Sequence, residues 1–276
     1  MNRPLGTNDP FRDQETWDEH TARFWMEALE QRTVAADQRG LRTRLIQLVG
    51  VQTGDTVIEV GCGTGALLAD LTRAARPGGH AIGIEPQPVF AEAARQRLLR
   101  EGLASAAEVR TARAEHLDLP NAQAAACLAQ TVFIHLPADA LQRTLAEVVR
   151  AVRHGGRVLS VDQDGDTWVI DHPERELTRR IVRFNSDQRY ADGWRGRQLR
   201  RLFLEAGLVH VEVHCWVHID TDASSYLFGM AERLALAASE AGVVDKEEAI
   251  RWIHDLAAQG NFFSSMNYYA RVGVRA

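Results

Sequence analysis

Hydrophobic and polar positions change their spacing along the chain, and each change predicts a different element. From residue 16 to about residue 48, large apolar side chains recur at the spacing of amphipathic helices, at Trp17, Phe24, Trp25, Leu29, Leu41, Leu45 and Leu48. Short apolar runs then predict five strands, at residues 56–60, 80–84, 109–112, 124–131 and 157–161. Helical spacing returns between these strands, and His154-Gly155-Gly156 is expected to end the last of these helices. Strands that alternate with helices favour right-handed crossovers and a mostly parallel sheet.

Composition and charge narrow the class of protein. A chain of 276 residues with 45% hydrophobic and 25% charged residues is typical of a globular protein. No apolar run approaches the roughly 18 residues of a membrane-spanning helix, so we expect a cytoplasmic protein with no membrane partner. The net charge of -5 disfavours a nucleic-acid partner, because affinity for phosphate backbones comes from clustered basic residues.

Cysteine and arginine residues add little chemistry at this level. Cys62, Cys127 and Cys215 lie far apart and form neither a disulfide framework nor a zinc spacing. Arginines recur between residues 175 and 201, but acidic residues lie among them, which predicts a solvated, internally paired surface.

A glycine-rich turn joins the first predicted strand to the helix that follows it. Residues 57–65 read V-I-E-V-G-C-G-T-G, and such a turn exposes backbone N–H groups at a helix N-terminus, where a ligand can approach closely. This segment resembles the first motif of the class I S-adenosylmethionine-dependent methyltransferases, including the acid two residues before the first glycine. Residues 130–136 and 149–159 resemble later stretches of the same family in matching order. The resemblance spans residues 57–162 and is closest to the ubiquinone-biosynthesis-like branch that acts on small molecules.

The resemblance implies S-adenosylmethionine as the cofactor and a set of residues that hold it. Glu85 ends the second strand, where a carboxylate can accept hydrogen bonds from both ribose hydroxyls. The branch commonly has Gly-Asp-Ala after the third strand, whereas residues 112–115 read Ala-Arg-Ala-Glu, so adenine recognition is assigned instead to the Ala114 backbone and Glu115. The full predicted set is Glu59, Gly61, Cys62, Gly63, Gly65, Glu85, Pro86, Gln87, Ala114, Glu115 and Gln130.

Alternative functions share part of this pattern. Gly61, Gly63 and Ala66 also fit G-x-G-x-x-A, which would place a dinucleotide on the turn of an NAD-linked oxidoreductase. A relative that binds the cofactor without transferring a methyl group has the same motifs. A nucleic-acid methyltransferase is disfavoured by the acidic balance.

Catalytic candidates come from the strand ends. Methyl transfer from a sulfonium is an in-line displacement that chiefly needs positioning, with a general base where the acceptor is a hydroxyl or an unactivated amine. His135 follows the fourth strand and Asp162 follows the fifth, at the edge where open α/β sheets bind ligands. His135 has a packing role as its alternative, and Arg197 could face an anionic substrate group. The histidines at 210, 214 and 218 predict one face of a strand, and we expect no metal.

These features together predict an α/β fold, a Rossmann-like doubly wound and mostly parallel sheet with N-terminal helices and a C-terminal helical and strand lid region. We expect a helical cap over residues 1–48, a cofactor-binding core over 49–167 and a C-terminal part over 168–276 that completes the sheet and contributes a substrate lid. Aromatic residues gather in the two flanks, which indicates a small, aromatic or apolar acceptor for O-, N- or C-methylation. A homo-oligomer is a further expectation.

Overall fold

The central sheet follows the order β3-β2-β1-β4-β5-β8-β6, with β7 paired to β8 as well. It comes from a computed structural model that describes residues 9–258 and 262–276. Five strands are parallel, namely β1 (Thr56–Val60), β2 (His80–Glu85), β3 (Ala107–Thr111), β4 (Ala124–Gln130) and β5 (Val152–Gln163). The antiparallel ones are β6 (Val169–Ile170), β7 (Leu208–Asp220) and β8 (Ser264–Arg275). The predicted α/β fold with a mostly parallel sheet is confirmed.

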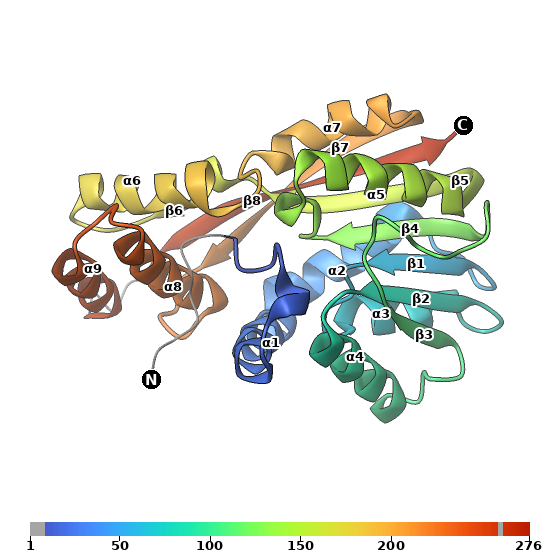
Figure 1. The fold of residues 1–276 in the computed structure, drawn as a ribbon, viewed down its shortest axis with the longest axis horizontal. Helices are drawn as coiled ribbons and strands as arrows, with labels where there is room; N and C mark the ends of the chain where they lie inside the picture. Colours follow the sequence, from blue (N-terminus) through green and yellow to red (C-terminus); the bar gives the residue numbers. More distant parts are fainter. Residues whose placement is uncertain (1–8, 259–261) are drawn as a thin grey trace.

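Helices cover both faces of this sheet (Figure 1). They are α1 (Glu19–Val34), α2 (Ala36–Val49), α3 (Ala66–Ala75), α4 (Pro88–Arg100), α5 (Ala138–Ala151), α6 (Arg175–Phe184), α7 (Arg195–Glu205), α8 (Tyr226–Glu240) and α9 (Lys246–Ala258). In β1, Val57 faces a core shared with α2, α3 and α4, whereas Ile58 and Val60 face a core shared with α5 and α7. The alternation of side chains along a strand therefore builds two apolar layers.

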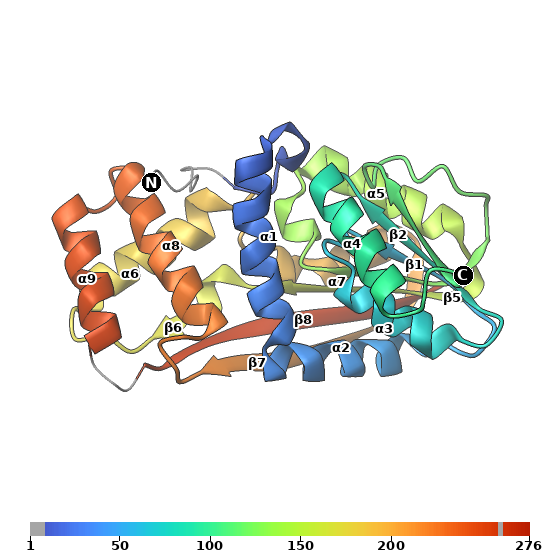
Figure 2. The ribbon, with the colours of Figure 1, turned by 90° about the horizontal axis from the view of Figure 1, so that it is seen from below.

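The helices α6, α8 and α9 lie beyond the parallel strands, and α1 lies between α8 and α4 (Figure 2). The helices α6, α8 and α9 belong to the same apolar layer as α2 and α3, through residues such as Leu234 and Trp252. This arrangement leaves the carboxyl ends of β1, β2 and β4 facing α1 and α8. Of the helices in the described ranges, none combines the length and the apolar character needed to cross a bilayer.

Two strands differ from the prediction because their ladders contain irregularities. The stretch His154-Gly155-Gly156 was expected to end a helix, but β5 begins at Val152, which pairs with Ala124 before a shift in register. In β7 the register shifts between Val209 and Glu212, and His210 has φ +51°. A bulge changes which side chains share a face, so the expected single face of histidines at 210, 214 and 218 is wrong.

Candidate active site

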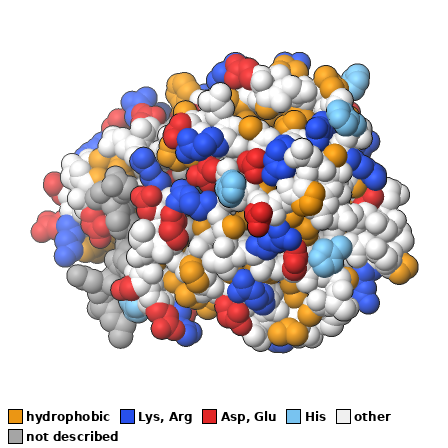
Figure 3. Space-filling model, turned by 45° about the vertical axis from the view of Figure 1, so that its right-hand side comes forward, with side chains coloured by type: hydrophobic (Ala, Val, Ile, Leu, Met, Phe, Trp, Pro, Cys, Tyr) orange, Lys and Arg blue, Asp and Glu red, His pale blue; other side chains and the backbone are white. Residues whose placement is uncertain are grey.

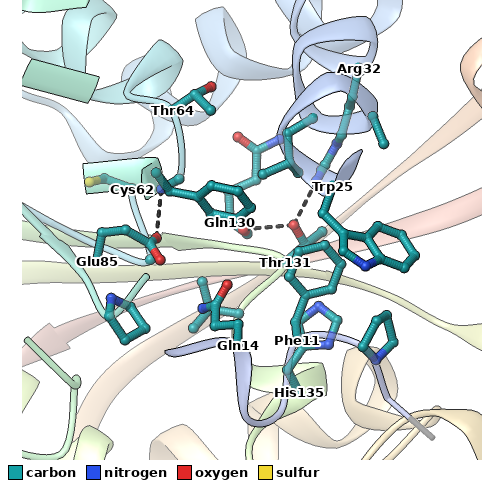
Figure 4. A pocket seen from close by; sticks show the side chains of 18 of the residues that line it. Phe11, Gln14, Trp25, Arg32, Cys62, Thr64, Glu85, Gln130, Thr131 and His135 are labelled. Atoms are coloured by element: carbon teal, nitrogen blue, oxygen red, sulfur yellow. Dashed lines mark hydrogen bonds between the residues drawn. The ribbon is translucent and has the colours of Figure 1, made fainter. Parts of the chain in front are cut away.

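A cavity of about 220 Å³ opens at the carboxyl ends of β1, β2 and β4. Figure 4 shows Cys62 and Glu85 on one side of it and Trp25, Phe11 and His135 on the other. The cavity is therefore lined both by the predicted cofactor turn and by side chains from the N-terminal segment, from α1 and from the turn after β4.

Each glycine of the turn after β1 has its own role. At Gly63, where φ is +53°, an added Cβ would make only an ordinary contact with Leu29, at 3.7 Å. At Gly61 a Cβ would lie 2.4 Å from Val132, and at Gly65 it would lie 2.9 Å from Ala94. Gly61 and Gly63 line the cavity, whereas Gly65 lies outside its lining and lets α3 approach α4. Gly63 is thus the position that keeps backbone open to a ligand.

The carboxylate of Glu85 is buried at the end of β2 and lines the cavity. Its Oε2 accepts a hydrogen bond from the Gly63 N–H, and its Oε1 accepts one from the Gln87 N–H, both at 2.9 Å. Burial raises the pKa of Glu85 to about 7, and these two hydrogen bonds oppose that rise. Because Gln87 itself caps α4 and does not line the cavity, it supports Glu85 from behind.

Glu59 is a second buried carboxylate in the cavity wall. Burial, together with the negative charge of Glu85, raises the pKa of Glu59 well above its usual value, while Arg42 opposes the rise. Its Oε2 has no hydrogen-bond partner among the described residues. A buried acceptor without a partner is costly, so this atom can accept a donor from a bound molecule.

Pro86, Ala114 and Glu115 line the end of the cavity next to β2 and β3. Arg113 forms ion pairs with Glu115 and with Glu15 of the N-terminal segment. Residues 112–115, which depart from the common Gly-Asp-Ala pattern, therefore hold the N-terminal segment against this end of the cavity.

The carboxyl end of β4 presents Gln130 and Thr131 to the cavity. Thr131 has φ +52°, a conformation that favours glycine. Its Oγ1 accepts a hydrogen bond from Arg32 of α1 at 2.7 Å, and the Gln130 side chain donates to Gln38 of α2 at 3.3 Å. Local strain of this kind is characteristic of ligand sites.

His135 lines the cavity from the short helical turn η2 (Phe133–His135). Its Nδ1 lies 2.8 Å from a carboxylate oxygen of Asp9, and its ring contacts the rings of Phe11 and Tyr190, with centroids 5.0 and 5.4 Å away. A carboxylate on Nδ1 favours the tautomer with its proton there, which leaves Nε2 as a proton acceptor. The pair can therefore act as a general base.

Comparison with known proteins establishes the family. A family model described as a methyltransferase domain matches residues 57–156. A protein from Streptomyces fradiae, described as an uncharacterized 37.1 kDa protein in transposon TN4556, is 31% identical over 246 residues, which cover 88% of this chain and 69% of that protein. The chain belongs to the class I S-adenosylmethionine-dependent methyltransferases. As a member of this class, the chain is an enzyme whose cofactor is S-adenosylmethionine. This assignment replaces the alternative of an NAD-linked oxidoreductase.

Solved structures show the same fold at low sequence identity. The methyltransferase aligns with the YcgJ protein from Bacillus subtilis at a TM-score of 0.61 and 15% identity, over 86% of this chain and 99% of that one. A geranyl diphosphate C-methyltransferase from Streptomyces coelicolor, solved with Mg²⁺, geranyl diphosphate and S-adenosyl-L-homocysteine, aligns at a TM-score of 0.53 and 15% identity, over 98% of this chain and 90% of that one. Identities this low carry the fold alone.

Asp162, the second catalytic candidate of this methyltransferase, lies outside the cavity lining and is fully buried. It accepts hydrogen bonds from the Ile134 N–H at 3.1 Å and from the Ser160 hydroxyl at 2.9 Å. Burial raises the pKa of Asp162 to about 6, against these hydrogen bonds and the nearby charges of His135 and Arg195. The structure therefore places it behind η2, where it fixes the turn that presents His135.

The arginines between residues 175 and 201 match the predicted solvated, internally paired surface only in part. Arg197 forms ion pairs with Asp164 at 2.5 Å and with Asp166 at 3.1 Å, and it does not line the cavity. Arg189 and Arg195, however, are buried. Arg195 donates to backbone carbonyls of η2 and of the residue after it, because those carbonyls need partners inside the fold.

Sequence reasoning missed several residues that line or support the cavity, namely Asp9, Phe11, Arg32, Thr131, Arg189, Tyr190, Tyr226 and Arg233. They come from the N-terminal segment, α1, the residue after β4, the turn after α6 with the residue that follows it, and α8. No short spacing connects them. The concentration of aromatic residues in both flanks is the one sequence signal that points to these regions.

Proposed function

We propose that this methyltransferase transfers the methyl group of S-adenosylmethionine to a small-molecule acceptor that enters the cavity on the side of His135. The observation that carries the proposal is one cavity lined by Glu59, Gly63 and Glu85 and also by His135, which is paired with Asp9 behind it. The expected link to the ubiquinone-biosynthesis-like branch stays a prediction.

The residues at the β1 and β2 ends fit the cofactor. Gly63 leaves backbone open, and the buried oxygens of Glu85 can exchange their present N–H partners for two sugar hydroxyls. The unpartnered Oε2 of Glu59 fits a cationic amino group, whose charge would also restore the ionised carboxylate. Pro86, Ala114 and Glu115 supply the wall for a purine.

The bound cofactor supplies an activated methyl group on a sulfonium. The protein's part is then to hold the acceptor in line and to remove its proton where it has one. His135 Nε2 is the group that takes this proton, and Asp9 holds the ring and stabilises the imidazolium that forms. Phe11 and Tyr190 restrict the ring and exclude water around it.

Calorimetry tests the first half of this proposal, and labelled transfer tests the second. Titration with S-adenosylhomocysteine should give one saturable site, while NAD should give none. Methyl-labelled cofactor should then pass its label to a fraction of low-molecular-mass metabolites and not to tRNA or protein. Label found only in tRNA or protein would overturn the small-molecule acceptor.

A further inference from the structure

The part of the cavity lined by Arg32, Asn185, Arg189 and Arg233, here called its outer half, is cationic. Three arginines reach it from separate elements, Arg32 from α1, Arg189 from the turn after α6 and Arg233 from α8. The carboxylates that line the cavity are Glu15, Glu59, Glu85 and Glu115, and Arg12, Arg42 and Arg113 line it as well. Among the described residues, no carboxylate that lines the cavity comes from α1, from the turn after α6 or from α8, so the arginines of the outer half have no lining carboxylate on the elements that carry them.

Arg189 is a buried charge without a partner. Only 5% of the residue is exposed, and across the described residues it forms neither an ion pair nor a hydrogen bond, with Nη1 fully shielded from solvent. Burial lowers the pKa of Arg189, while Tyr190, Asp9 and Glu240 raise it from beyond ion-pair distance. An unpaired buried charge is costly in a folded protein, so this arrangement calls for an anion from outside.

Arg233 is half-buried, with its guanidinium 5.9 Å from the centroid of the Trp25 ring, and within the described ranges it has no ion pair. Burial lowers the pKa of Arg233 and the positive charge of Arg189 lowers it further, while Tyr226 and Glu232 oppose this. The two guanidinium groups are thus close enough to repel each other, and an anion between them would remove that repulsion.

Two further hydrogen-bond donors in this part of the cavity also lack an acceptor. The Nη2 of Arg32 and the Nδ2 of Asn185 are buried without a hydrogen-bond partner in the described part of the chain, and both residues line the cavity. Guanidinium groups donate and cannot accept hydrogen bonds. The unmet need in this half of the cavity is therefore for acceptor oxygens.

The backbone that presents Asn185 and Arg189 is itself unusual. Residues Asn185–Arg189 form a π-helical turn (η4) that continues α6. This turn is fixed by a hydrogen bond from the Ser186 hydroxyl to Asp166 at 2.5 Å and by close packing of Gly193 against Ser186. Such turns are rare and are found frequently at functional sites.

We propose that the outer half of the cavity binds an oxyanion of the methyl acceptor, a carboxylate or a phosphate, between Arg189 and Arg233, with Arg32 and Asn185 as further donors. The inference rests on the proposed function, since it names the acceptor class of the same site. The anion would anchor the acceptor at the end away from the reacting atom and present that atom to His135.

Anion titrations test this directly. Protein saturated with S-adenosylhomocysteine is titrated by calorimetry, at constant ionic strength, with benzoate, with phenyl phosphate and with neutral benzyl alcohol. We expect saturable 1:1 binding of at least one anion and none of the alcohol, and the preferred anion identifies carboxylate or phosphate. Arg189→Gln and Arg233→Gln should each weaken that binding at least about tenfold. Arg179→Gln, which removes an exposed charge from α6, should leave it unchanged.

Stability of the free protein provides a second readout that does not depend on the chosen anions. Because Arg189 is buried and unpaired, Arg189→Met should raise Tm in the absence of ligand, whereas Arg189→Lys should not. Anion affinity that is equal in the wild type and both glutamine variants, or a Tm that falls in Arg189→Met, would overturn the inference. Failure of the wild type to bind S-adenosylhomocysteine would instead count against the proposed function, and the anion titration of the free protein would still test this site.

Discussion

At the scale of single residues, Glu85 is the group on whose charge the proposed cofactor site depends. Its pKa is raised to about 7 by burial, and ribose hydroxyls bind to the ionised form. Cofactor binding below pH 7 must therefore first remove a proton, so affinity should fall with falling pH. For a pKa near 7, the Kd for S-adenosylhomocysteine should be about tenfold higher at pH 6 than at pH 8. Calorimetry across this range measures it.

The matched variant for this test is Glu85→Gln, which keeps the shape of the side chain and cannot ionise. Its affinity should be lower at pH 8 and should change less between pH 8 and pH 6. A variant with the full pH dependence of the wild type would show that another group, such as Glu59, carries the effect.

Gly63 tests the geometry of the turn in the same way. In Gly63→Val the side chain would occupy the space that the turn leaves open, so affinity for S-adenosylhomocysteine should fall by about a hundredfold or more, close to 2.8 kcal/mol. Gly78→Val is the matched control, because Gly78 also has a positive φ, of +81°, and open space at its Cβ. It should carry a similar backbone strain and keep the affinity. Retained binding in Gly63→Val would refute the proposed loop.

At the scale of elements, the sequence predicted the features that depend on neighbouring residues along the chain. The strand into the glycine turn and the acid at the end of β2 were both predicted from adjacent residues, and the structure brings Glu85 within 2.9 Å of the Gly63 N–H. The bulge in β7 and the π-turn that presents Arg189 were not predicted. Both depend on partners elsewhere in the fold, β8 for the bulge and Asp166 for the turn, so the period of the sequence does not show them.

The His135–Asp9 pair joins two such distant elements, and its role can be measured. His135→Gln should lower turnover by roughly 10²-fold or more, because it removes a positioned base. Asp9→Asn should cause a smaller loss, and both should keep the affinity for S-adenosylhomocysteine. The assay is transfer of labelled methyl to an acceptor fraction that supports the wild type.

His254→Gln is the control for this pair, since His254 is exposed on α9. It should behave as the wild type in both measurements. If His135→Gln turned over normally, His135 would be a packing residue, and transfer would depend on positioning alone.

At the scale of the whole molecule, the surface and the core carry different information. Basic and acidic side chains are interspersed on the face in Figure 3. The apolar layer that contains α2 and α3 also contains α8 and α9. The proposed division into a cap, a cofactor-binding core and a C-terminal part therefore describes where ligands are expected to bind. The hydrophobic core itself runs through all three parts.

A shared core predicts one cooperative unfolding transition. The six tryptophans include the buried Trp25 in α1 and Trp252 in α9 as well as Trp216 in β7. Their fluorescence therefore reports on helices over the cavity and on the sheet, while far-UV circular dichroism reports on all helices and strands. The two signals should change together in urea. At about 100 times its Kd, S-adenosylhomocysteine should add about 2.7 kcal/mol to the free energy of unfolding in both signals. A separate fluorescence transition at lower urea, unaffected by this ligand, would mean that part of the fold unfolds independently of the sheet that carries the proposed cofactor site.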